Sequence, residues 1–136
     1  MGNARRKARP AVDPALKRYE KQFEALRAEL AELGFFCKGT VLARRMRCGK
    51  ATCACQSDPR QRHGPYFGWS RKVKGKTISL HLQPEEAEVY LQGTAQWRRL
   101  RKLLGRMEAL SQRAIARKAK LRKQLRATQH DTISQR

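Results

Sequence analysis

Three cysteines and one histidine stand close together in the sequence, at Cys48, Cys53, Cys55 and His63. Their spacing is C-x4-C-x-C-x7-H, so four sulfur and nitrogen ligands can reach a single ion. Structural zinc is held by four Cys or His ligands in a tetrahedron, and the first gap lies within the usual reach of a C-x2-4-C pair. The pattern therefore predicts one structural Zn2+ per chain. A metal with four protein ligands has no open position for a hydrolytic water.

Two alternatives to this ligand set stay open. Cys37 precedes Cys48 by eleven residues and competes with His63 for the place of fourth ligand. Cys53 and Cys55 could instead do thiol-redox chemistry, although no resolving partner or redox fold accompanies them. Simple burial of the thiols is disfavoured because the segment is polar and offers almost no aliphatic neighbours. A disulfide is disfavoured because no secretory signal is visible, and a cytosolic chain keeps its thiols reduced.

The charge of the chain is the second strong feature. The formal net charge is +21, and most of it lies in two blocks. Residues 34–83 contain eleven Lys and Arg against one acid, and residues 97–136 contain thirteen against two. Such an excess repels itself and calls for a polyanion. Nucleic acid is the first expectation, and an anionic membrane surface is the runner-up. No apolar run is long enough to span a membrane.

The elements that must position these groups follow from periodicity and from turn signals. Asp13-Pro14 begins a helix with an N-cap and a proline at the first helical position. Pro84-Glu85-Glu86 begins a second helix with acids in its first turn. The predicted segments are 1–12 (disordered basic arm), 13–34 (N-terminal helix), 35–83 (zinc-knuckle and β-hairpin module), 84–127 (long basic C-terminal helix) and 128–136 (disordered tail).

The first helix carries apolar residues at alternating spacings of three and four, and the second carries them on one seam that Ser111 and Lys118 interrupt. These seams predict antiparallel, coiled-coil-like pairing. The second helix is much longer, so its basic far half is expected to be left for another chain or for nucleic acid. The stretch expected to pack on the first helix is 97–110. The first seam is Leu16, Tyr19, Phe23, Leu26, Leu30 and Leu33, and the second is Trp97, Leu100, Leu104, Met107, Ala114, Leu121 and Leu125.

Between the helices the sequence predicts a strand over 40–47 and a hairpin of strands 65–73 and 76–82 around Lys74-Gly75, because both arms alternate in period two. One face of the hairpin is expected to be the core face, with Phe67 and Trp69 on it. The fold class is thus α+β, a small zinc knuckle with a three-stranded sheet flanked by two helices. The core face is predicted to contain Phe67, Trp69, Val73, Ile78, Leu80 and Leu82, and the opposite face Tyr66, Ser70, Lys72, Thr77, Ser79 and His81.

The order of motifs carries a resemblance. R-C-G-K-x-x-C-x-C, a polar loop, H-G-P-Y, a strand, a lysine-glycine-lysine turn, a second strand and a proline-led helix resemble a small bacterial family of unknown function. That family is often encoded beside transposases and recombinases. The resemblance covers residues 39–105 and implies an accessory factor of a mobile element, with a transposase or recombinase as partner.

No catalytic constellation is visible in the sequence, so the chain is not expected to be an enzyme. We expect a zinc-knuckle protein that binds nucleic acid, DNA rather than RNA, and self-associates through its helices. Its compartment would be the cytoplasm, at the nucleoid. The alternative is a helical adaptor whose basic surface docks an acidic protein or the recombinase itself.

The predicted nucleic-acid contacts fall in the two basic blocks. A two-stranded ribbon fits the major groove of DNA, where hydroxyl side chains reach base edges. Tyr66 is instead the best candidate for stacking on a single-stranded base, since Phe67 and Trp69 are expected in the core. The predicted contact residues are Arg44, Arg45, Arg47, Lys50, Tyr66, Ser70, Arg71, Lys72, Lys74, Lys76, Thr77 and Ser79 around the sheet, and Arg113, Arg117, Lys120, Arg122 and Lys123 on the second helix.

Overall fold

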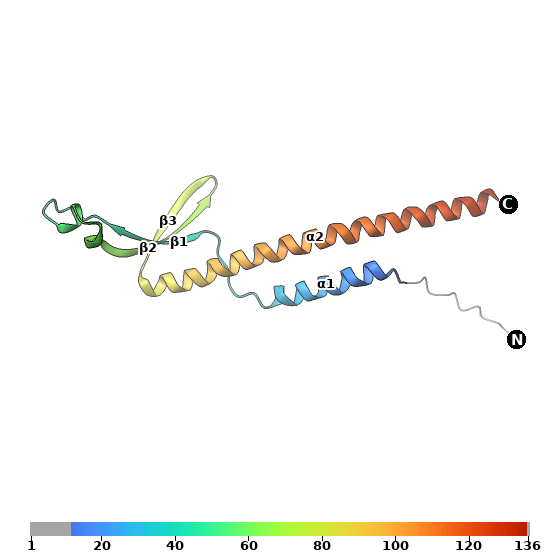
Figure 1. Ribbon diagram of the computed structural model, residues 1–136, viewed down its shortest axis with the longest axis horizontal. Coiled ribbons are helices and arrows are strands. Elements are labelled where there is room, and N and C mark those ends of the chain that lie inside the picture. Colours follow the sequence, from blue (N-terminus) through green and yellow to red (C-terminus); the bar gives the residue numbers. More distant parts are fainter. Residues whose placement is uncertain (1–11, 136) are drawn as a thin grey trace. The chain divides into compact units, whose positions relative to one another are not determined.

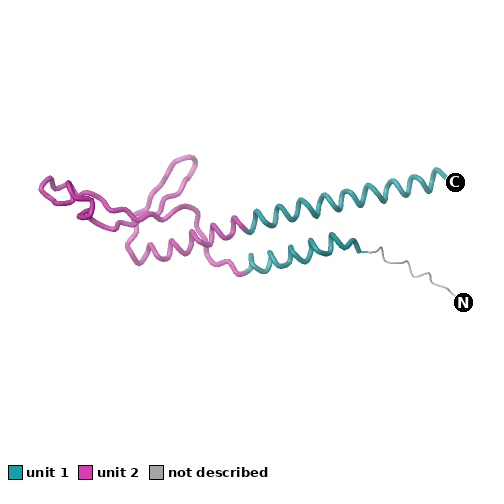
Figure 2. Tube along the Cα trace, viewed as in Figure 1, with its two compact units in different colours: residues 1–31, 103–136 teal, residues 32–102 magenta. Residues whose placement is uncertain are grey.

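The computed structural model describes residues 12–135 and contains two α-helices and one three-stranded antiparallel sheet (Figure 1). This confirms the α+β class. The described part of the chain divides into two units, one made of residues 32–102 and the other of 12–31 with 103–135 (Figure 2). The elements in chain order are α1 (Pro14–Ala31), β1 (Thr40–Met46), the 3-10 turns η1 (Ala54–Gln56) and η2 (Pro59–Gln61), β2 (His63–Val73), β3 (Lys76–Leu82) and α2 (Pro84–Ser134).

The sheet lies in the unit of residues 32–102 and has the strand order β1-β2-β3. The β2–β3 hairpin turns at Lys74 and Gly75, which have φ of 50° and 79°. Positive φ at both central residues is the backbone twist that two-residue hairpin turns need, and glycine adopts it without steric cost. The predicted hairpin is confirmed, and β2 begins two residues earlier than expected, at His63.

One face of the sheet packs on the first turns of α2. The register places Phe67 opposite Leu82 and Trp69 opposite Leu80, as the alternation predicted. The ring centroids of Trp69 and Tyr90 are 4.9 Å apart. The indole N–H of Trp69 donates to the Lys38 carbonyl at 2.8 Å. Both the core role expected for Trp69 and the face assigned to it are therefore confirmed.

This face changes character toward the hairpin tip. Leu82 is fully buried together with Ala87 and Thr94 of α2. Ile78 and Leu80, expected in the core, are each 42% exposed. The sheet extends past the helix turns that cover Leu82, so the tip keeps its apolar side chains in solvent.

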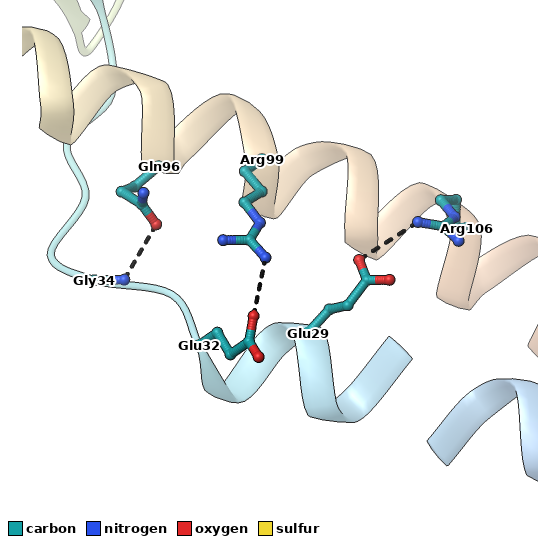
Figure 3. Close-up of polar contacts among 6 residues, drawn as sticks. All are labelled: Glu29, Glu32, Gly34, Gln96, Arg99 and Arg106. Atoms are coloured by element: carbon teal, nitrogen blue, oxygen red, sulfur yellow. Dashed lines mark hydrogen bonds and ion pairs between the residues drawn. The ribbon is translucent and has the colours of Figure 1, made fainter. Parts of the chain in front are cut away.

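The segment that joins α1 to β1 is held against α2 within the same unit. The Gly34 amide donates to Gln96 Oε1 at 3.1 Å, and the Arg99 Nη2 atom lies 3.4 Å from Glu32 Oε2 (Figure 3). Phe36 stacks on Trp97 with ring centroids 5.7 Å apart.

The other unit pairs α1 with residues 103–134 of α2. Its buried core consists of Leu26, Leu103 and Leu110. The two helices are also joined by an ion pair, in which Arg106 Nη1 lies 3.5 Å from Glu29 Oε2 (Figure 3). All five α1 seam residues in this unit are buried or half-buried, which confirms the seam. The partner stretch reaches further along α2 than the predicted 97–110, because residues as far as Lys118 line the groove beside α1.

The phase of the predicted α2 seam was wrong at two positions. Leu104 is 50% exposed and Leu125 is 64% exposed, whereas the adjacent Leu103 and Leu110 are buried. Several leucines stand within one turn of each other in this helix, and only the partner helix decides which of them faces inward. The buried and half-buried positions of this part of α2 recur at alternating spacings of four and three residues. They are Leu103, Met107, Leu110, Ala114, Arg117 and Leu121.

The helix ends differ from those expected. α1 ends at Ala31, so Leu33 and Gly34 lie in the linker. α2 continues to Ser134, past the predicted end at residue 127, so most of the expected disordered tail is helical. No glycine or proline interrupts residues 128–134, and the hydroxyls of Thr128 and Thr132 donate to carbonyls four residues earlier. The predicted basic arm lies outside the described residues except for Val12.

Within residues 12–135, no helix has the length and apolar character needed to cross a membrane.

Candidate metal centre

Four potential ligands converge between β1 and β2. One ligand atom from each of Cys48, Cys53, Cys55 and His63 lies within 4.8 Å of all the others. The Cys53 sulfur is 3.4 Å from His63 Nε2, and the Cys55 sulfur is 3.5 Å from the Cys48 sulfur. Ligands of one tetrahedral zinc ion, with Zn–S bonds near 2.3 Å, lie about 3.8 Å apart. The group therefore fits one metal ion.

The local chain path explains how so short a C-x-C pair can serve one site. Cys53 stands at the start of η1, and the single 3-10 turn brings Cys55 back beneath Cys48. The Cys48 amide then donates to the Cys55 sulfur at 3.3 Å. Backbone N–H groups that point at cysteine sulfurs stabilise the thiolates that bind metals.

Gln56 supports the loop, although sequence reasoning did not single it out. Its side-chain amide donates to the Cys48 carbonyl at 2.6 Å and to the Lys50 carbonyl at 3.3 Å. These bonds tie the two sides of the loop together. A glutamine in a polar segment has no periodicity or spacing that would mark such a role.

The surroundings of the thiols favour deprotonation at one position. The Cys55 amide, the His63 ring and the neighbouring thiols lower the pKa of Cys53 to about 6. The Cys48 amide also lowers the pKa of Cys55, but burial and the adjacent Cys53 and Cys48 sulfurs outweigh it, so that pKa is raised. The pKa values of Cys53 and Cys55 are therefore shifted in opposite directions. A bound metal cation would favour the thiolate form of all three cysteines.

Cys37 does not belong to the cluster. Its amide donates to the Gly93 carbonyl at 3.2 Å, and its sulfur lies 4.0 Å from the Tyr90 carbonyl, both on α2. A side chain at Gly93 would come within 2.8 Å of this sulfur, so Cys37 is packed against the helix backbone. His63 is the fourth member of the cluster, and Cys37 is not part of it.

The sheet face away from α2 carries many of the predicted contact residues. The register pairs Arg44 with Tyr66, Ser70 with Ser79, and Lys72 with Thr77 on this face. We call it the open face; a groove of about 280 Å³ lies on it beside β1. The Ser70 and Ser79 hydroxyls bond each other at 2.8 Å. Hydroxyls paired in this way are less available for base edges than the sequence suggested.

Four predicted contact residues around the sheet lie elsewhere. Arg71 and Lys76 belong to the opposite face, and the Arg71 guanidinium is 4.1 Å from the centre of the Trp69 ring. Lys74 lies in the turn. Arg45 follows Arg44 at the irregularity in β1 and donates to the Gly64 carbonyl at 3.4 Å. Alternation along the strand separates Arg71 from the open face, and its aromatic neighbour gives it a different partner.

Arg47 and Lys50 are exposed close to Cys48 in the sequence. On α2, Arg113, Lys120, Arg122 and Lys123 are exposed as expected.

Arg117, predicted to contact nucleic acid, forms an ion pair within the protein. Its guanidinium holds the Asp13 carboxylate through two bonds, of 2.6 and 3.1 Å. Asp13 is only 12% exposed, and it also accepts the Leu16 amide as the N-cap of α1. The sequence placed Arg117 in a basic run, and only the antiparallel pairing shows that it faces α1.

The fold and the cluster define a class of small α+β protein with a Cys3His group that can hold one metal ion. Residues 16–91 match the family model of a domain of unknown function, DUF6788, and the chain belongs to that family. Neither the curated proteins nor the solved structures contain a match to the chain.

Proposed function

We propose that the chain is a non-enzymatic nucleic-acid-binding protein whose basic sheet is held in shape by a structural zinc ion. The observation that carries this proposal is the charge around the cluster. Between residues 34 and 83 the only acid is Asp58, and Arg60 binds it through both its amide and its guanidinium. The remaining basic side chains have no acid of their own segment to neutralise them, and phosphates suit such a surface.

Zinc is the metal that suits the donor set. Three thiolates and one imidazole are soft and borderline ligands, which exclude Mg2+ and Ca2+ and favour a tetrahedral Zn2+. The small core supports a structural role, because few residues of the sheet unit are fully buried. A zinc site supplies on the order of 10 kcal/mol of folding free energy where burial is scarce.

The biological setting rests on the resemblance of the motif order to proteins encoded beside transposases and recombinases. On that basis the nucleic acid would be DNA, and the protein would be an accessory factor that brings a recombinase to it.

A second candidate is an adaptor that docks a protein. The observation that favours it is a groove of about 460 Å³ along α1 and α2, whose lining is mostly apolar and includes Leu16, Tyr19, Phe23 and Ile115. Ile115 is 64% exposed. An apolar groove of this kind is a common seat for a partner helix.

Affinity for fluorescein-labelled oligonucleotides, measured by anisotropy over a series of salt concentrations, separates the two candidates. Nucleic-acid binding predicts that the logarithm of the affinity falls linearly with the logarithm of salt, because counterions are released from phosphates. Polyglutamate of the same charge is the control. Equal binding of polyglutamate and nucleic acid, or no binding of nucleic acid at low salt, would contradict the proposal and favour the adaptor.

A further inference from the structure

The open face of the sheet has a gap in its middle strand. Gly68 of β2 lies between Leu42 on β1 and His81 on β3 in the register, and Tyr66 and Ser70 stand two residues to either side of it. The side-chain position at Gly68 is therefore vacant while its neighbours project. These residues line the groove of about 280 Å³.

The walls of this gap suit an aromatic ring. Tyr66 is 44% exposed, and its ring lies 6.4 Å from the ring of His81 at an angle of 48°. Leu42 and Met46 add apolar surface, at 40% and 53% exposed. Exposed aromatic and apolar groups on a sheet form a stacking platform for bases, which all have a π face.

The rim of the gap is positive. Arg44 lines the groove and lies opposite Tyr66 in the register. Lys72 is exposed further along the same face, and none of the three strands contains an acid. A ligand with flat apolar rings and a negative backbone complements both features at once. An acidic peptide supplies the charge, but it has no regular series of rings.

A base inside a duplex cannot enter a concave gap, because its faces are covered by the bases above and below. A ribbon that reads the major groove needs projecting donors and acceptors. Here the central position has no side chain, and the flanking Ser70 and Ser79 are bonded to each other. The geometry favours an unpaired base over a base pair.

We propose that the open face binds single-stranded nucleic acid, with one unpaired base seated over Gly68 against Tyr66 and His81. This inference rests on the proposed nucleic-acid function and names its substrate class. Arg44 and Lys72 contact the phosphates on either side of the seated base.

Gly68→Val tests the seat without disturbing the sheet. A Cβ at Gly68 meets nothing closer than the Leu80 carbonyl at 3.7 Å, and the backbone there lies outside the left-handed region. Valine favours strands, so the variant fills the gap and keeps the fold. Gly34→Val is the matched control, because that position also has open space and lies in the linker away from the sheet.

Affinities of the full zinc-loaded chain are measured for oligothymidylate, oligouridylate and a mixed-sequence duplex. Gly68→Val is expected to weaken binding of the single strands about tenfold or more, which is the loss expected from one unstacked base, and to leave duplex binding unchanged. Tyr66→Leu should weaken single-strand binding in the same direction. Gly34→Val should match the wild type, and the two single strands show whether DNA or RNA is preferred.

Unchanged single-strand affinity in Gly68→Val, or equal losses for single strand and duplex, would overturn the seat while leaving nucleic-acid binding intact. Failure of the wild type to bind any of the three oligonucleotides would instead overturn the proposed function. Thermal melting of each variant confirms that the fold is kept.

Discussion

At the scale of single residues, the metal cluster gives the sharpest expectation. Zinc-loaded wild type should contain one zinc per chain by elemental analysis, because one group of four ligand atoms lies within 4.8 Å. His63→Ala should lose most of that zinc. Cys37→Ser should keep it, because the Cys37 sulfur packs on α2 near Tyr90. Full zinc in His63→Ala with loss in Cys37→Ser would contradict the ligand assignment.

The Asp13–Arg117 pair gives a second residue-scale prediction, which concerns pH. The Arg117 side chain and the Leu16 amide lower the pKa of Asp13 from 3.8 to about 2. A carboxyl whose pKa is lower in the folded state stabilises that state above its unfolded pKa, and the contribution is lost as the pH falls through the folded value. Arg117→Met should therefore melt below the wild type near pH 5, and the difference should shrink as the pH approaches 2.

Thermal melts by circular dichroism at several pH values test this prediction. Arg113→Met is the control, because Arg113 is exposed on the same helix and has no ion-pair partner among the described residues. A deficit for Arg117→Met that is the same at every pH would show that the charge of Asp13 contributes nothing.

Residue spacing was enough to find the Cys/His cluster, with Cys37 left open as an alternative to His63, but it did not find the contacts between distant residues. The four cluster residues follow from a dense Cys/His pattern, because they lie close together in the chain. Asp13 and Arg117 are 104 residues apart, and Arg71 meets Trp69 only because both lie on one strand face. Contacts of this kind depend on tertiary packing, which no short motif encodes.

At the scale of elements, the pairing of α1 with α2 is tested through Leu26. Leu26 is 6% exposed, so Leu26→Asp would bury an unpaired carboxylate and should cost several kcal/mol of folding free energy. Ala28→Asp places the same charge at an exposed position of the same helix and should change stability little. Denaturant unfolding of the two variants measures the difference, and equal stabilities would mean that α1 is not packed.

Element positions were predicted well where the signal is local and less well where it depends on a partner. The strands, the turn at Lys74-Gly75 and both helix starts follow from alternation, glycine and caps. The inward face of α2 was misplaced at Leu104 because the adjacent Leu103 fits an apolar stripe equally well. The end of α2 at Ser134 was missed because polar sequence without glycine or proline neither favours nor stops a helix.

At the scale of the whole molecule, the proposed nucleic-acid binding implies that some of the net charge of +21 attracts any nucleic acid and that other contacts select among nucleic acids. Arg122, Lys123 and Arg126 are exposed on α2, on a stretch without aromatic residues. Replacing all three with glutamine keeps the helix and removes three charges. The slope of log affinity against log salt should fall by up to about three, with no change in the preference between oligonucleotides. The corresponding sheet variant, Tyr66→Leu, removes no charge and should reduce preference more than slope.

Loss of preference in the helix variant, with preference retained in the sheet variant, would place the selecting surface on α2. Truncation after Gln112 is a poorer test. It would remove Ala114 and Arg117, which pack on α1, and so confuse charge with folding.

We propose that a metal ion bound at the cluster holds the basic sheet in its binding form. The measurement that tests it most directly is the ratio of single-strand to duplex affinity for the zinc-loaded chain and for the same chain stripped by a chelator, at one salt concentration. We predict that the stripped chain keeps weak binding through α2 but loses the ratio, and that added zinc restores it. An unchanged ratio in a chain shown by elemental analysis to be free of metal would contradict the account.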